Sequence, residues 1–185
     1  MPKALISDLK KRMQSTQDAL HREFAGLRTG RASIALLEPV MVDAYGSKMA
    51  LTSVGTISAP EARLLTVQVW DKSMVASVEK SIRESGLGLN PMADGQLIRI
   101  PLPELSQERR IEMTKIAKKY AENARVAIRN VRRDGMEALK KMEKEASLPE
   151  DEHHRYADEV QELTDTFIKH IDEDLALKEK DIMQV

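Results

Sequence analysis

Four arginines stand close together in the second half of the chain, within the segment 125–133 (Arg-Val-Ala-Ile-Arg-Asn-Val-Arg-Arg). They are Arg125, Arg129, Arg132 and Arg133. A guanidinium group is planar and donates two parallel hydrogen bonds, so it binds phosphate oxygens better than a lysine does. Spacings of three and four residues place such side chains on one side of a helix. The segment therefore predicts a phosphate-binding face, with a solvated charged face as the plainer alternative.

A helical wheel of this region supports the same interpretation. The apolar side chains share one sector, and the arginines lie roughly opposite together with Lys118 and Lys140. Only Asp134 and Glu137 lie close enough in the sequence to pair with them on the same helix. Aromatic residues make up 3% of the chain, too few to form a stacking platform for single-stranded bases. We therefore expect the partner to be the phosphate backbone of a structured nucleic acid.

Motifs for catalysis are absent from the sequence. There is no Gly-x-x-x-x-Gly-Lys-Ser/Thr loop, and Gly86-Leu87-Gly88 lacks the third glycine of a dinucleotide site. The four histidines form neither a His-Glu-x-x-His frame nor a pair with a Gly-x-Ser-x-Gly turn, and there is no cysteine. The run 151–154 (Asp-Glu-His-His) is as well explained by an acidic helix start as by a metal site. We expect no enzymatic activity, no cofactor and no metal.

Three long helices are predicted to position the arginines. Apolar residues recur at helical spacing along 5–27, from about 106 to 146, and after the Ser147-Leu148-Pro149-Glu150 break. Ser106 is a plausible N-cap of the second helix. The predicted apolar stripes are Leu5, Leu9, Met13, Thr16, Leu20, Phe24 and Leu27; Met113, Ile116, Tyr120, Ala124, Ala127, Val131, Ala138 and Met142; and Tyr156, Val160, Leu163, Phe167, Ile171 and Leu175.

The segment 31–104 has a different pattern. Strands are predicted at 40–45, 64–70 and 96–100, and a short helix, with Val75, Val78 and Ile82 on one face, ends near Gly86. The fold class is therefore α+β with two domains: a discontinuous three-helix bundle, 1–30 and 105–185, with an inserted α/β domain, 31–104. The chain crosses between them twice, near Gly30 and Pro103, which predicts a hinge.

Charge is divided unevenly along a chain whose net charge is only −1. The segment 105–145 has 12 Lys and Arg against 7 Asp and Glu, whereas 146–185 has 4 against 12. A basic helix beside an acidic one suits an anionic partner on one side of the bundle. Mutual neutralisation of the two helices is the alternative.

Several strings in the chain, taken together, resemble the bacterial ribosome recycling factor family. The similarity extends from end to end in length, motif order and helix–insert–helix–helix plan. The strings are Arg28-Thr29-Gly30-Arg31-Ala32-Ser33, Tyr45-Gly46, Asp71-Lys72-Ser73-Met74, Leu87-Gly88-Leu89-Asn90-Pro91, Ile98-Arg99-Ile100-Pro101-Leu102-Pro103, Glu108-Arg109-Arg110 and Arg129-Asn130-Val131-Arg132-Arg133-Asp134.

The resemblance implies an L-shaped molecule with a small β/α/β domain on a three-helix bundle. It also implies a factor that acts with elongation factor G and GTP to split post-termination ribosomes into subunits, as a cytoplasmic monomer with no membrane contact. Its bundle would lie on the 23S-type ribosomal RNA of the large subunit, with Arg28, Arg129, Arg132 and Arg133 in or near the contact. The matching inter-domain hinge residues are Thr29, Gly30, Arg31, Pro101, Leu102 and Pro103.

Two questions stay open at this point. A helical protein-interaction adaptor or chaperone would also pair basic and acidic helices with partners. Gly135 lies inside a predicted helix, where glycine costs about 1 kcal/mol relative to alanine. It marks either a local bend or close packing against a neighbouring helix.

Overall fold

The computed structural model describes residues 2–27, 29, 31–145 and 147–184 of the 185-residue chain. It divides into two compact units: Met1–Phe24 with Thr114–Lys180, and Ala25–Met113 with Asp181–Val185. The chain passes from one unit to the other after Phe24 and before Thr114, whereas the sequence placed these crossings near 30 and 105. Two of the predicted residues, Arg28 and Gly30, lie outside the described residues.

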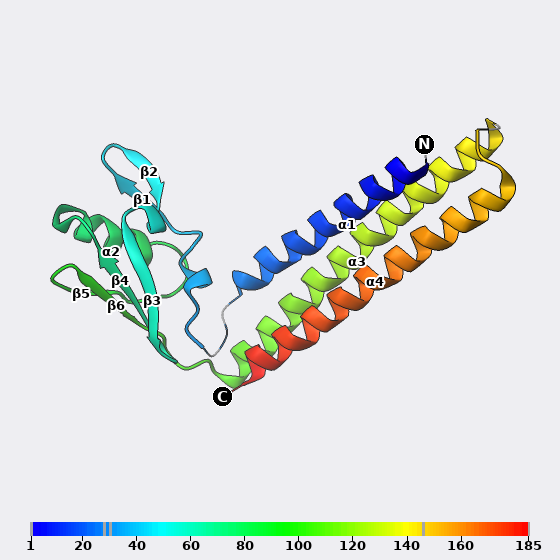
Figure 1. The fold of residues 1–185 in the computed structure, drawn as a ribbon. Helices are drawn as coiled ribbons and strands as arrows, with labels where there is room; N and C mark the ends of the chain where they lie inside the picture. Colours follow the sequence, from blue (N-terminus) through cyan, green and yellow to red (C-terminus); the bar gives the residue numbers. More distant parts are fainter. Residues whose placement is uncertain (1, 28, 30, 146, 185) are drawn as a thin grey trace. The chain divides into compact units, whose positions relative to one another are not determined.

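Three helices build the first unit: α1 (Pro2–Ala25), α3 (Gln107–Lys144) and α4 (Glu150–Met183). They run side by side over most of their length (Figure 1). The predicted stripe of α1 is confirmed, because Leu9, Met13, Leu20 and Phe24 are buried. The stripe of α4 is confirmed at Tyr156, Val160, Phe167 and Ile171.

Thr164 is also buried in α4, although the prediction had Leu163 in this turn. Its hydroxyl donates a hydrogen bond of 2.7 Å to the carbonyl oxygen of Val160, one turn earlier in the helix. The polar group is therefore satisfied inside the bundle, which lowers the cost of burying it.

The helix ends follow the predicted signals. The Ser106 hydroxyl oxygen accepts a hydrogen bond of 3.2 Å from the Arg109 amide, which makes it the cap of α3. The Ser147 hydroxyl donates to the Met142 carbonyl oxygen at 2.9 Å where α3 ends. Three acidic residues, Glu150 to Glu152, form the first turn of α4, where the helix dipole favours negative charge.

The buried face of α3 differs from the predicted stripe. Its buried residues are Arg110, Ala117, Ala121, Ala124, Ile128, Val131, Gly135 and Leu139, whereas Ile116 is 37% exposed. At about 100° per residue, this face is rotated by roughly 50° from the predicted one. The prediction included Ala124 and Val131 of this face but missed the fully buried Ile128 and Leu139.

The described residues of the second unit form six strands, of which the sequence predicted three. The strands β1 (Met41–Ala44) and β2 (Ser47–Ala50) form a two-stranded sheet. The strands β3 (Gly55–Glu61), β4 (Leu64–Val69), β5 (Met92–Asp94) and β6 (Leu97–Pro101) form an antiparallel sheet in the order β3-β4-β6-β5. The prediction missed β2, β3 and β5.

The core of the second unit lies between its strands and α2 (Val75–Arg83). Val78 and Ile82 of the helix are fully buried, as predicted, against inward-facing residues of β4 and β6 such as Val67 and Ile98. Alternate residues along β4 and β6 are buried, as expected for a sheet with one face in the core. In the described part of the chain, no helix is long and apolar enough to cross a membrane.

Candidate nucleic-acid interface

Two of the four predicted arginines point outward from α3. The side chain of Arg129 is 55% exposed and makes one ion pair, from Nη1 to Glu122 Oε1 at 3.3 Å. Arg133, one turn further on, is exposed and has no hydrogen bond or ion pair within the described residues. Its five N–H donors are therefore available to a ligand. Lys118 and Lys140 are exposed on the same helix.

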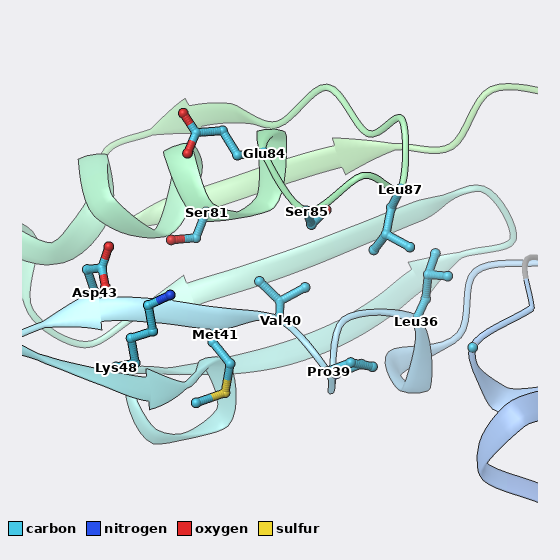
Figure 2. A pocket seen from close by; sticks show the side chains of 11 residues that line it. Leu36, Pro39, Val40, Met41, Asp43, Lys48, Ser81, Glu84, Ser85 and Leu87 are labelled. Atoms are coloured by element: carbon cyan, nitrogen blue, oxygen red, sulfur yellow. The ribbon is translucent and has the colours of Figure 1, made fainter.

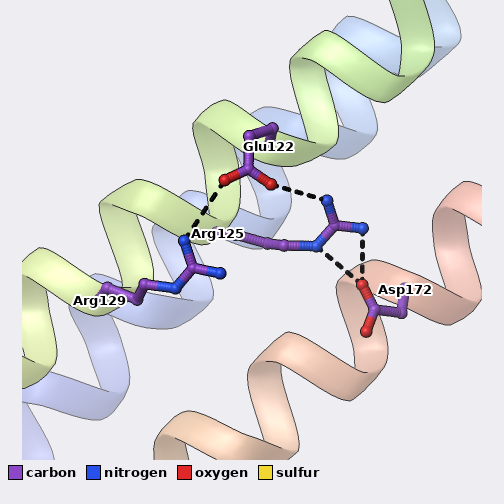
Figure 3. A network of polar contacts seen from close by, with 4 residues as sticks. All are labelled: Glu122, Arg125, Arg129 and Asp172. Atoms are coloured by element: carbon purple, nitrogen blue, oxygen red, sulfur yellow. Dashed lines mark hydrogen bonds and ion pairs between the residues drawn. The ribbon is translucent and has the colours of Figure 1, made fainter.

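Arg125 links α3 to α4 (Figure 3). Its side chain is only 19% exposed, and Nε and Nη2 both bind Asp172 Oδ1, at 2.8 and 2.7 Å. Nη1 binds Glu122 Oε2 at 3.1 Å. The guanidinium is thus held by two carboxylates, and the prediction that this side chain faces solvent is wrong.

The charges in this network stabilise one another. Partial burial lowers the pKa of Arg125, but hydrogen bonds with Asp172 and Glu122 outweigh that effect and raise it above its ordinary value. The hydrogen bond from Arg125, with a smaller contribution from Arg129, lowers the pKa of Glu122. Both groups therefore remain charged at neutral pH, and Glu122 holds Arg125 and Arg129 at fixed positions on α3.

Arg132 is also turned toward α4. Its Nε donates a hydrogen bond of 2.6 Å to Gln161 Oε1, and Gln161 Nε2 in turn donates to Asp165 Oδ1 at 2.8 Å. The residue is half-buried, so part of its charge faces the groove between the helices. The prediction that it faces solvent is only partly correct.

The carboxylates near the arginines also differ from those predicted. Asp134 binds Arg12 of α1 at 2.6 Å instead of an arginine of its own helix. The partners that the sequence interpretation missed are Glu122 and Asp172. Glu122 could have been found, because it precedes Arg125 by three residues. Asp172 could not, since the contact joins residues 47 apart on different helices.

The predicted hinge residues that are described lie in the second unit, where the two crossing segments are tied to the turn between β3 and β4. The Ala32 amide donates to the Ala62 carbonyl oxygen at 2.7 Å, and the Leu102 amide donates to that of Arg63 at 2.8 Å. Pro101 ends β6, Leu102 is buried in the core of the unit, and Pro103 is exposed. Thr29 and Arg31 share a local hydrogen bond of 3.2 Å, from the threonine hydroxyl to the arginine carbonyl oxygen.

The histidines near the start of α4 form pairs with carboxylates. His153 Nδ1 lies 3.4 Å from Glu143 Oε2, and His154 Nε2 lies 3.8 Å from Glu150 Oε1. Among the residues that the structure describes, no group of three or more His, Asp or Glu side chains is arranged to hold a metal ion.

The fold and the exposed Arg129 and Arg133 define a class of protein: a helical bundle with an inserted α/β unit and exposed arginines on one long helix. The sequence pattern of the family described as ribosome recycling factor matches residues 20–183. This match covers most of the chain, which therefore belongs to the ribosome recycling factor family.

Individual relatives agree with this assignment. The ribosome-recycling factor of Rhodospirillum centenum is 61% identical over 97% of this chain and 97% of its own length, and that of Granulibacter bethesdensis is 61% identical over 98% and 96%. A solution structure of a ribosome recycling factor aligns with a TM-score of 0.82 and 42% identity, over 100% of this chain and 98% of the other. Another match has a TM-score of 0.71 and 42% identity over the whole of both chains. It describes models for the T. thermophilus ribosome recycling factor and the E. coli elongation factor G bound to the E. coli post-termination complex.

Proposed function

We propose that this chain acts with elongation factor G and GTP to split post-termination ribosomes into subunits in the cytoplasm, and that it binds the large subunit as a monomer. Membership of the ribosome recycling factor family supports the role, and the exposed face of α3 supports the mode of binding. Arg133 and Arg129 contact phosphates of large-subunit ribosomal RNA. Arg125 and Arg132 act indirectly, because they fix α3 against α4 and so position the contact.

The observation that carries this assignment is the contrast between Arg133 and Arg125. Arg133 is exposed and has no internal partner among the described residues, whereas Arg125 is held by two carboxylates. The free energy of RNA binding is more favourable for a guanidinium that does not first have to break an ion pair within the protein. The sequence alone had placed the two residues in one group.

Sedimentation of the protein with isolated large subunits over a salt series tests the mode of binding. Each phosphate contact contributes roughly 0.7–0.9 to the magnitude of the slope of log K against log salt. Loss of one contact in Arg133→Ala should therefore reduce that magnitude by about 0.7–0.9. Lys169→Ala is the matched control, because it removes one charge from the exposed side of α4 and should leave the slope unchanged. Binding that is insensitive to salt would instead indicate apolar docking, as expected of a helical adaptor or chaperone.

The role itself is tested by light scattering of post-termination ribosomes mixed with the protein, elongation factor G and GTP. We expect the scattering to fall as subunits separate, and Arg129→Ala with Arg133→Ala to slow that fall. GTP should be hydrolysed only when elongation factor G is present, since the chain carries no phosphate loop. Unchanged scattering with the parent protein would refute the proposed role.

A further inference from the structure

A groove of about 380 Å³ runs between β1 and the end of α2 in the second unit (Figure 2). Asp43 and Lys48 lie at one end and Leu36 and Leu87 at the other, while α2 contributes Ser81, Glu84 and Ser85. The volume falls near the lower limit for ligand sites, so the groove would hold a short segment of a larger partner.

One wall of the groove is the free edge of a strand. β1 pairs only with β2, and the turn between them has two residues, Tyr45 and Gly46, with φ of +52° and +82°. A two-residue turn of this kind is closed by a hydrogen-bonded pair, here Ala44 and Ser47, and hydrogen-bonded residues then alternate along the strand. The peptide groups of Val42 therefore face β2, and those of Met41 and Asp43 face the opposite edge.

This edge has unused hydrogen-bonding capacity. Within the described ranges, the amides of Met41 and Asp43 have no backbone acceptor outside the β1–β2 pair. An unpaired edge of this kind can accept an added strand, and main-chain hydrogen bonds then supply much of the affinity. Met41 is 51% exposed, so the edge is accessible.

The charges lining the groove favour a basic segment. The lining includes two carboxylates, Asp43 and Glu84, and one amine, Lys48, and no ion pair involving any of them occurs in the described part of the chain. The groove also lies at the C-terminal end of α2, where the helix dipole favours positive charge. Val40 and Met41 lie nearer the apolar end of the groove, and Asp43 follows them two to three residues further along β1. Residues two apart in an added strand point to the same side.

We propose that this groove binds an extended segment of a partner protein, in which an apolar residue and a lysine or arginine stand two positions apart. The segment adds as a strand to the free edge of β1. Its apolar side chain lies against Leu36 and Leu87, and its cation lies near Asp43 and Glu84.

The test uses the full-length ¹⁵N-labelled protein and three blocked tripeptides, followed by NMR. Acetyl-Val-Thr-Lys-amide should shift the resonances of 39–43 and 81–87 and slow the amide exchange of Met41 and Asp43. Acetyl-Val-Thr-Glu-amide should bind about two- to fivefold more weakly, the range for one exposed charge pair. The lysine peptide methylated at its backbone nitrogens should lose most of its binding, because it cannot donate to the strand edge.

Two exposed variants of the protein complete the test. Asp43→Asn should weaken binding of the lysine peptide about two- to fivefold, and Lys48→Met, its control with the opposite sign, should strengthen it. Both should keep the parental NMR spectrum outside the groove. Equal binding of the lysine and glutamate peptides, undiminished binding of the methylated peptide, or no shifts at millimolar peptide would each overturn the proposal.

Discussion

Gly135 of α3 packs directly against Leu9 of α1: a β-carbon at position 135 would lie 2.5 Å from Leu9 Cδ1 and 3.3 Å from Cδ2. The glycine is therefore explained by close packing between helices. Leu9 is fully buried at this point, and the neighbouring Asp134 binds Arg12 of α1 at 2.6 Å. The contact and the ion pair together fix α1 on α3.

Gly135→Ala should destabilise the protein even though it removes a glycine from a helix. Overpacking a core costs about 1–3 kcal/mol, and the gain in helix propensity offsets about 1 kcal/mol of this. We expect a net loss of about 1 kcal/mol, seen as a melting temperature lower by about 2–4 °C. Urea unfolding followed by circular dichroism measures the difference.

The sign of this effect should reverse when Leu9 is shortened. Leu9→Ala alone should cost about 2–5 kcal/mol, because it leaves a cavity in the bundle. In that background Gly135→Ala has room, so it should restore up to about 1 kcal/mol. A double-mutant cycle with additive effects would show that the two residues do not contact each other.

Much of the architecture could be predicted from the sequence, and the errors have physical causes. The long stripes of α1 and α4 and the cap at Ser106 are local patterns of periodicity and hydrogen bonding. β5 (Met-Ala-Asp) and β2 (Ser-Lys-Met-Ala) carry no β-branched pattern, and β3 contains Pro60 beside an irregular register, so neighbouring strands define them more than their own residues do.

The candidate site could be predicted only in part. A wheel shows which side chains share a face of one helix, and it correctly placed Arg129 and Arg133 on the exposed side. It cannot show what a neighbouring helix places opposite, and Asp172 of α4 is what turns Arg125 inward. The predicted stripe of α3 also omitted Ile128 and Leu139, which are fully buried, so the predicted orientation was rotated.

Arg125 and Arg133 should respond differently to removal of their charge. Arg125→Met keeps an apolar stem of similar length but removes the link to Asp172 and Glu122, so we expect a loss of stability of about 1 kcal/mol. Arg133→Ala should stay within about ±0.5 kcal/mol, as at most exposed positions, yet weaken binding to large subunits. If thermal melting ranked the two variants in the opposite order, the assignment of positioning and contact roles would be wrong.

The network at Glu122 should also make stability sensitive to acid. The pKa of Glu122 is lowered in the folded state, so the stability it contributes is present above its ordinary value of 4.5 and is lost as the pH falls through the folded value. Glu122→Gln should therefore be less stable than the parent at pH 7, and the difference should shrink below about pH 4. Melting curves of the two proteins from pH 3 to 7 measure it.

Tyr45 and Asp71 provide a second pH-dependent contact, in the α/β unit. The tyrosine hydroxyl donates to Asp71 Oδ2 at 2.6 Å, and this hydrogen bond raises the pKa of Tyr45 and lowers that of Asp71. Its stabilisation is present at neutral pH, is lost in acid as Asp71 is protonated, and is lost in alkali as Tyr45 ionises above its ordinary value of 10.0.

Tyr45→Phe should thus be less stable than the parent near neutrality. The two should converge as the pH falls through the lowered pKa of Asp71 and as it rises through the raised pKa of Tyr45. NMR titration of the Tyr45 ring gives an independent check, because its ionisation should occur at higher pH in the parent than in Asp71→Asn. Equal midpoints would show that the hydrogen bond does not persist in solution.

Substitutions at Leu102 and Pro103 distinguish a role in packing the α/β unit from a role in the predicted hinge. Leu102 is buried in the core of the α/β unit and its amide is bound to Arg63, so Leu102→Ala should cost about 2–5 kcal/mol of stability. Pro103 is exposed and has a fixed φ, so Pro103→Ala should change stability little while loosening the returning segment. If movement of the α/β unit is part of ribosome splitting, Pro103→Ala should alter the splitting rate in light scattering but leave large-subunit binding near the parental value. A parental rate for Pro103→Ala would indicate that this segment does not serve as the hinge.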